Sequence, residues 1–588
     1  MTRDLRRNKS LSLSLSLYME KPMFTGDLPV HKRLSRFAVH EVGTDLSHLS
    51  PNERKAIPLL IKVGKLLDAL YIRQMWSGNE KLLERLKDHN DKQLLTLFDM
   101  YKGPWAREDS STPFIADVPP RPEGANFYPE DMTKDEFEAW VTGLNEHDQK
   151  HAKGFYSVIR RNNKGELYHV PYSNEYGDIL LQVANLFKHA SRLVEDPSLS
   201  HFLYMRALAF ENNKYLDSEV AWLKISKESK FEITAGPYEV YTDRLHGYKS
   251  AFEFYLHMRD FPSSKLLEKF SSSLQYVEDH LPIPDEYKNR KLVAPPIVVV
   301  NQLFSSGDVA VPMTAGCHQD RWLQARPHQE YTGGQVCACA HPDRPANDRR
   351  EPAKIRHVGV GGPFVLLAIV NVMVTSVDAH KIHLCSSRSD AFTTHILLHE
   401  VTHSNGPHHI VNCPEDTVRS RLQEFHSQIE EAKADIAGLF AAALLIKSGV
   451  IENVKPEELW VTFLASAFRT LRFGITGAHG AGQAAQVNYL LDAGGFVHDA
   501  STGRYSVDFT RIEQAVSDLT RDIMILQGDG DKELVRAFVT RYANNRPETC
   551  QTLERIEGAG VPVDIRPIYT VEKLFPHEPE VEATEGGQ

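Results

Sequence analysis

The most informative part of the sequence is HILLHEVTH at residues 395–403, followed by EEAKAD at residues 430–435. On an α-helix, His399 and His403 of the HExxH pattern lie one turn apart and face the same way. Two neutral imidazoles so placed can bind one Zn²⁺, and Glu400 can reach a water on the metal as general base. The helix is predicted to be buried by the apolar residues on its other faces, Ile396, Leu397, Leu398 and Val401.

A second helix is predicted over residues 415–448, after a break at Gly406-Pro407. On this helix Glu431 can supply a third zinc ligand, and Asp435, one turn later, can accept a hydrogen bond from a ligand histidine. Three protein ligands leave a fourth position for water, which is typical of catalytic rather than structural zinc. Zinc lowers the pKa of such a water toward ~7, so Glu400 can take its proton during attack on a carbonyl.

Two neighbouring side chains are not expected to be ligands. His395 lies one turn before His399 and is predicted to support a ligand or to pack in the core. Lys433 is predicted to point away from the site into solvent. The alternative for the whole stretch is a pair of amphipathic helices whose polar side chains have ordinary hydrogen-bond partners.

The composition is typical of a globular protein with more than one domain. The chain has 588 residues, 41% hydrophobic and 25% charged. It carries 67 Lys and Arg against 78 Asp and Glu, a net charge of −11, which argues against nucleic acid or an anionic membrane as main partner. The six cysteines are too few for a disulfide scaffold. No run of about 18 apolar residues occurs, so we predict no transmembrane helix and expect a cytoplasmic protein.

The sequence pattern divides the chain into five parts. Residues 1–26 are basic and then alternate Ser with Leu, which indicates a disordered or targeting tail. Helical periodicity and the strand-like segment 231–243 predict a mixed α/β lobe over residues 27–300. The remaining parts are predicted to be a mostly helical zinc-binding lobe (301–530), a C-terminal segment packing on the lobes (531–574) and a disordered acidic tail (575–588). Residues 313–356 show no sustained period, which indicates an insertion or an imperfect gene model.

With HEVTH and EEAKAD together, the chain resembles the dipeptidyl peptidase III family of metallopeptidases (family M49), especially the branch found alone or fused behind Nudix domains. The family's second motif, EExxA(E/D), is matched by Glu430, Glu431, Ala434 and Asp435. The resemblance implies that Glu431 is a zinc ligand and that Glu430 supports one. It also implies an α+β, mainly helical fold of two lobes around a wide cleft, with a helical zinc lobe and a mixed lobe containing a β-barrel-like core.

Three further residues match the family in weaker segments. Tyr241, in EVYTD at residues 239–243, matches a tyrosine that binds the scissile carbonyl; it could equally be a half-buried strand residue. His479 matches the family's transition-state histidine, and the alternative is a histidine at a helix start. Asn347 matches an asparagine that anchors the free N-terminus of the peptide. The first motif departs from the family pattern, which is usually HExxxH, because one residue is missing between Glu400 and the second histidine.

The resemblance implies a zinc-dependent metallopeptidase with one Zn²⁺ per chain, which hydrolyses bonds near the N-terminus of short peptides through a water activated by Glu400. Two other functions stay open at this point. The short HExxH motif also permits a zinc hydrolase or isomerase acting on a non-peptide small molecule. A non-catalytic protein that captures peptides is the third possibility.

Overall fold

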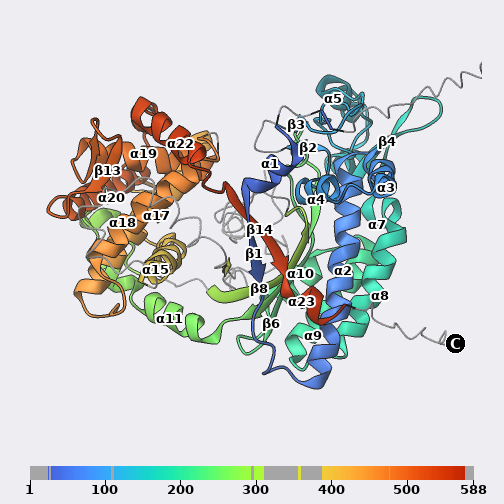
Figure 1. Cartoon of the computed structure of the whole chain (residues 1–588), viewed down its shortest axis with the longest axis horizontal. Coiled ribbons are helices and arrows are strands. Elements are labelled where there is room, and N and C mark those ends of the chain that lie inside the picture. The colour runs from blue at the N-terminus through green and yellow to red at the C-terminus, as the bar shows by residue number, and fades with distance from the viewer. Residues whose placement is uncertain are drawn as a thin grey trace, which may run out of the picture.

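The structure, a computed structural model, describes residues 24–25, 28–106, 111–292, 297–309, 355–358, 387–475 and 477–576. These residues form an α+β, mainly helical fold of two lobes, a mixed lobe at the right of Figure 1 and a helical lobe at the left. Asn347 and nearly all of residues 1–26, 313–356 and 575–588 lie outside the described residues.

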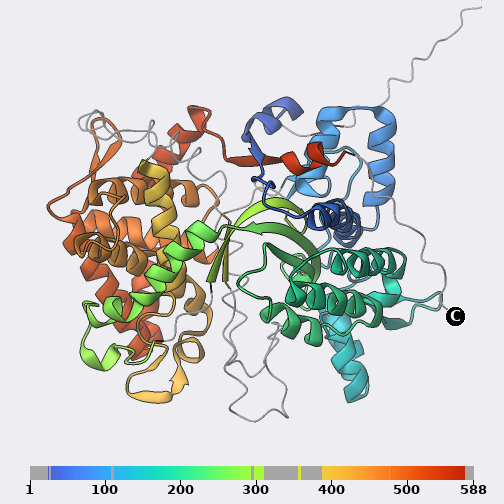
Figure 2. The same cartoon turned by 90° about the horizontal axis from the view of Figure 1, so that it is seen from below.

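A four-stranded sheet lies at the side of the mixed lobe that faces the helical lobe (Figure 2). Its strands, in spatial order, are β6 (Phe231–Glu239), β7 (Ala251–Arg259), β8 (Ile297–Gly307) and β9 (Ile355–Val358). The first three are antiparallel neighbours, and β9 runs parallel to β8. The described strands form no closed barrel, so the expected barrel-like core is an open sheet.

One face of this sheet is covered by α2 (Pro51–Met75), the longest helix of the mixed lobe. A capping box starts the helix: Glu53 N–H donates to Ser50 Oγ over 3.2 Å, and Ser50 N–H donates to the Glu53 carboxylate over 2.9 Å. Gly64 lets the helix approach closely, because a Cβ there would lie 2.6 Å from the Phe304 ring. Alternate residues of β7 face α2 as an apolar row, Phe252, Phe254, Leu256 and Met258.

The other elements of the mixed lobe surround α2 and the sheet. The helices are α1 (Val30–Ser35), α3 (Asn79–His89), α4 (Lys92–Tyr101), α5 (Lys134–Thr142), α6 (Glu146–Ala152), α7 (Tyr172–Glu175), α8 (Gly177–Ser191), α9 (Pro197–Asn212) and α10 (Leu216–Leu223). Two small hairpins pair β2 (Trp105–Ala106) with β3 (Thr112–Pro113), and β4 (Ser157–Arg161) with β5 (Leu167–Pro171).

The helical lobe is built around α17 (His426–Lys447), which packs on α15, α18, α19 and α20. Because it is surrounded, nearly all of its middle residues are buried, and many of them are alanines. The helices of this lobe are α11 (Phe261–Ser272), α12 (Leu274–Asp279), α15 (Ser387–Thr402), α16 (Val418–Leu422), α18 (Pro456–Leu471), α19 (Ala478–Asp492), α20 (Ile512–Asp529), α21 (Lys532–Tyr542) and α22 (Pro547–Gly558). Short hairpins pair β10 (His409–Ile410) with β11 (Cys413–Thr417), and β12 (Phe496–Asp499) with β13 (Arg504–Val507).

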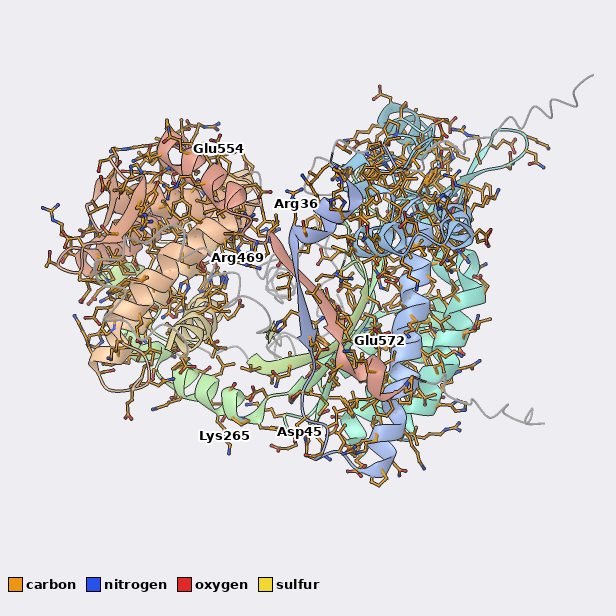
Figure 3. The ribbon with its side chains drawn as sticks, in the orientation of Figure 1. Arg36, Asp45, Lys265, Arg469, Glu554 and Glu572 are labelled. Atoms are coloured by element: carbon orange, nitrogen blue, oxygen red, sulfur yellow. The ribbon has the colours of Figure 1, made fainter. Side chains whose placement is uncertain are left out.

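The chain passes between the lobes more than once. Helices α11 and α12 precede residue 300, yet their apolar residues belong to the core of the helical lobe. After α22, strand β14 (Asp564–Tyr569) returns to the mixed lobe, pairs in parallel with β1 (Phe37–Val42), and leads into α23 (Thr570–Leu574). Arg469, on α18, lies near the start of this crossing (Figure 3) and forms an ion pair with Asp564 at 3.3 Å.

Across the described ranges, no helix is both long and apolar enough to cross a membrane.

Candidate metal centre

Helices α15 and α17 lie against each other because a glycine stands at their contact. A Cβ on Gly438 would meet the backbone N and Cα of His399 at 2.8 and 3.0 Å. Any larger residue would therefore push the helices apart. This close approach brings the HExxH pattern of α15 and the EExxxD pattern of α17 to one buried place.

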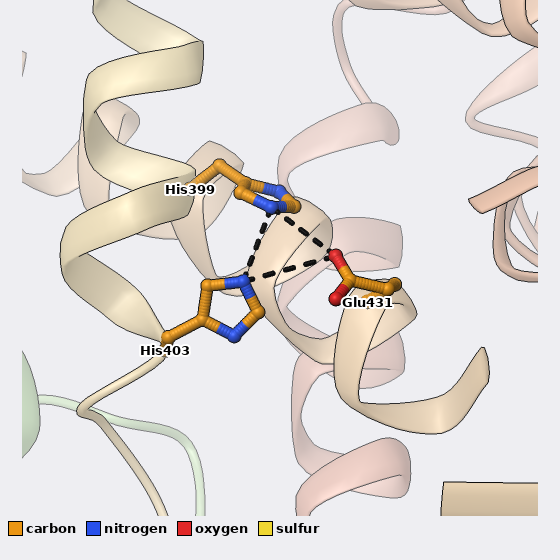
Figure 4. A group of neighbouring side chains, drawn as sticks. All are labelled: His399, His403 and Glu431. Carbon is orange, nitrogen blue, oxygen red and sulfur yellow. Dashed lines mark hydrogen bonds and ion pairs between the residues drawn. The ribbon is translucent and has the colours of Figure 1, made fainter. Parts of the chain in front are cut away.

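Three donor atoms from the two helices converge there (Figure 4). His399 Nε2 lies 3.2 Å from His403 Nε2 and 3.3 Å from Glu431 Oε2, and His403 Nε2 lies 3.7 Å from the same oxygen. A tetrahedral metal with bonds of about 2.0 Å holds its ligand atoms about 3.3 Å apart. The triangle therefore fits one small cation, and two imidazoles with one carboxylate are a donor set that suits zinc.

A carboxylate behind each histidine fixes which ring nitrogen faces the triangle. His399 Nδ1–H donates to Asp435 Oδ1 over 2.7 Å, and His403 Nδ1–H donates to Glu430 Oε1 over 2.9 Å. Each ring then turns its Nε2 lone pair toward the other. Such hydrogen bonds orient metal-ligating histidines and raise their basicity.

The charges around the triangle favour a positive charge within it. Burial lowers the pKa of His399, but the carboxylates of Asp435, Glu431 and Glu400 more than offset this effect, so the pKa lies well above its ordinary value. Burial lowers the pKa of His403 to about 3, only partly opposed by Glu430. Two facing imidazoles beside carboxylates can share one proton, or they can hold a metal cation in its place.

The Glu400 side chain lies beside the triangle and is fully buried. Its Oε1 is 4.0 Å from His399 Nε2. The carboxylate therefore lies next to the donor atoms, within reach of a molecule bound to a metal among them.

His479 is the fourth imidazole of this region and lies at the start of α19. Its Nδ1 is 3.4 Å from Glu431 Oε2, and its ring centroid is 6.3 Å from that of His399. Gly482 brings α19 onto α17, since a Cβ there would lie 3.1 Å from the Gln428 carbonyl oxygen. The structure thus places His479 at the edge of the metal centre.

Tyr241 lies elsewhere, in the turn after β6 of the mixed lobe, and is 62% exposed. Asn347 lies outside the described residues.

The structure corrects the prediction for Lys433. Its side chain is 1% exposed, and Nζ forms an ion pair with Glu430 Oε1 at 3.0 Å and donates to the His403 carbonyl oxygen over 2.8 Å. A helical wheel places Lys433 away from Glu431, but on that side α17 packs against the end of α15, not solvent. His395, as predicted, does not join the triangle: its Nε2 lies 2.9 Å from the Asp435 carbonyl oxygen.

Two glutamines that sequence reasoning missed hold the supporting carboxylates. Gln486 Nε2 donates to Asp435 Oδ2 over 3.2 Å, and Gln527 Nε2 donates to Glu430 Oε2 over 2.9 Å. They come from α19 and α20, far from either motif in sequence. A buried glutamine in a helix has no local pattern that marks its partner, so only the packing identifies them.

The chain was compared with known proteins. No protein-family model matches it. It is 34% identical over 597 residues to Nudix hydrolase 3 of Arabidopsis thaliana, covering 92% of this chain and 74% of that protein. Its structure superposes on that of DPP III from Caldithrix abyssi with a TM-score of 0.81 and 33% identity, covering 92% of this chain and 99% of that one.

The chain belongs to the dipeptidyl peptidase III family. A second member, dipeptidyl-peptidase III from Corallococcus sp. strain EGB, superposes with a TM-score of 0.72 and 37% identity, over 93% of this chain and 98% of that one. The family resemblance drawn from HEVTH and EEAKAD is therefore confirmed. The Nudix hydrolase relative agrees with the branch in which dipeptidyl peptidase III chains are fused to Nudix domains. Likeness to the family over nearly the whole chain supports a peptidase.

Proposed function

We propose that this protein is a zinc-dependent peptidase that cuts short peptides near their N-terminus. The triangle of His399, His403 and Glu431 carries the proposal, because its three separations of 3.2 to 3.7 Å suit one zinc ion. The names of the solved family members, both dipeptidyl peptidases III, support peptides as the substrate class.

Glu400 is the proposed general base and acid. Bound zinc would supply Lewis acidity that polarises a carbonyl and makes water easier to deprotonate. Glu400 would take one proton from the attacking water as the new C–O bond forms. It would then give that proton to the amide nitrogen as the C–N bond breaks, so the proton balance closes.

His479 and Tyr241 are proposed to act on the substrate carbonyl. His479, whose Nδ1 lies 3.4 Å from Glu431 Oε2, would donate a hydrogen bond to the oxyanion as it develops. Tyr241 lies on the other lobe, so a substrate that contacts both Tyr241 and Glu400 must span the two lobes. An extended peptide meets that requirement better than a compact small molecule.

Two measurements test the function. Zinc content is measured first, and we expect about one zinc per chain, lost in His399→Ala and in Glu431→Ala; retention of zinc in both variants would contradict the site. Turnover of a panel of dipeptidyl-naphthylamides is then measured with zinc restored. We expect Glu400→Gln to abolish turnover, while Glu452→Gln, at an exposed position of the same lobe, leaves it unchanged.

The same panel separates the alternatives. Zinc binding without turnover of any dipeptidyl substrate would favour a hydrolase or isomerase of a non-peptide molecule, which the short HExxH motif permits. Peptides recovered intact from the purified protein would favour a binding protein without catalysis.

A further inference from the structure

Lys433 is a buried lysine of α17 whose ammonium group lies between α17 and the end of α15. Its Nζ is 2.8 Å from the His403 carbonyl oxygen, 3.2 Å from that of Asn405 and 3.4 Å from that of Thr402. Its fourth neighbour is Glu430 Oε1, at 3.0 Å. An ammonium has three N–H donors, so these acceptors satisfy all of them.

His403 depends on such contacts more than His399 does, because α15 ends at Thr402. His403 therefore stands just beyond the last helical residue, whereas His399 lies within the helix. The last carbonyls of a helix have no partner inside it, and a cation at that end is favourable. Lys433 satisfies these carbonyls from a neighbouring helix and so holds the turn that carries His403.

Lys433 also holds the carboxylate that orients the His403 ring. Glu430 Oε1 accepts from both Lys433 Nζ and His403 Nδ1, while Oε2 accepts from Gln527. With both oxygens engaged, the carboxylate cannot rotate away from His403. One side chain thus fixes the backbone of His403 directly and its imidazole through Glu430.

We propose that Lys433 is a positioning residue that holds His403 in its metal-binding geometry. The proposal rests on zinc binding by His399, His403 and Glu431. This positioning and the charge of Lys433 act on zinc binding in opposite directions. A buried cation near Zn²⁺ repels the metal, so removing the charge would by itself strengthen zinc binding. Positioning outweighs this repulsion, so removing Lys433 weakens zinc binding, because the metal must then first order His403.

The test compares zinc affinities of metal-free proteins in competition with a chromophoric chelator. We expect Lys433→Met to bind Zn²⁺ about tenfold more weakly, within the range for residues that support metal ligands. Lys447→Met is the matched control, because Lys447 lies on the same helix but is exposed and pairs with Glu513; its affinity should equal that of the wild type. The visible spectrum of the Co²⁺-loaded protein should change in Lys433→Met and not in the control.

The outcomes separate this proposal from the function on which it rests. Failure of the wild type to bind Zn²⁺ would contradict the proposed function. A wild type that binds, with Lys433→Met binding equally or more tightly, would overturn the role of Lys433 alone. If Lys433→Met does not fold, Glu430→Gln/Lys433→Met leaves no uncompensated carboxylate, and we expect weaker binding than in Glu430→Gln alone; equal affinity would overturn the proposal.

Discussion

Replacing Gly438 with alanine tests the helix contact on which the metal centre depends. The new Cβ would lie 2.8 Å from His399 N, about 0.7 Å inside the ~3.5 Å optimum for non-bonded atoms. Both partners are helix backbone and cannot rotate away, so α17 must retreat by a similar distance. The distance from Glu431 Oε2 to His399 Nε2 would then exceed its present 3.3 Å. Metal sites tolerate only about 0.2 Å of error in ligand distances.

We expect Gly438→Ala to lose at least about 100-fold in zinc affinity, comparable to the largest effects seen for residues that support ligands. Overpacking costs about 1–3 kcal/mol, and the higher helix propensity of alanine returns about 0.5–1 kcal/mol. The central values differ by about 1 kcal/mol, so the free energy of unfolding of the metal-free protein should fall by about 1 kcal/mol.

Chelator competition and denaturant unfolding measure the two effects. Gly558→Ala is the matched control, because Gly558 is also helical and a Cβ there would meet nothing within 4 Å. The control should keep its zinc affinity and lose no stability, because alanine adds helix propensity there without a clash. Wild-type zinc affinity in Gly438→Ala would refute the claim that this contact sets the ligand geometry.

Three further predictions concern single side chains. Asp435→Asn should weaken zinc binding about 10- to 100-fold, because the amide holds the Nδ1–H of His399 less strongly than the carboxylate; isothermal titration measures the loss, and unchanged affinity would contradict the support role. His479→Ala should keep its zinc but lower kcat about 100-fold, the cost of one oxyanion donor, and an unchanged kcat would remove His479 from the mechanism. Burial lowers the pKa of Lys249 to about 7 from 10.5. Between these two pH values the unfolded chain therefore keeps a proton on Lys249 that the folded chain has lost. The unfolding free energy should then rise with pH over that window by up to about 1.4 kcal/mol per unit. Lys249→Met should remove this part of the slope, and equal pH profiles for the two proteins would contradict it.

The cluster of His399, His403 and Glu431 is the part of the site that sequence reasoning described best. Helical periodicity relates His399 to His403, and Glu431 to Asp435, because residues three or four apart share a face whatever surrounds the helix. The same reasoning failed for Lys433. Helical periodicity correctly predicted that Lys433 projects from a different side of the helix than Glu431. It could not predict whether that side faces solvent or the end of another helix.

The sequence alone determined the donor types, their spacing within each helix and the family to which the chain belongs. Only the tertiary structure decided which atoms meet: Gly438 against the His399 backbone, Gln486 and Gln527 on the supporting carboxylates, and Tyr241 on the opposite lobe. Periodicity is a local property that the backbone imposes within a few residues. Contacts between helices depend instead on how whole surfaces pack, and that information is spread over residues hundreds of positions apart.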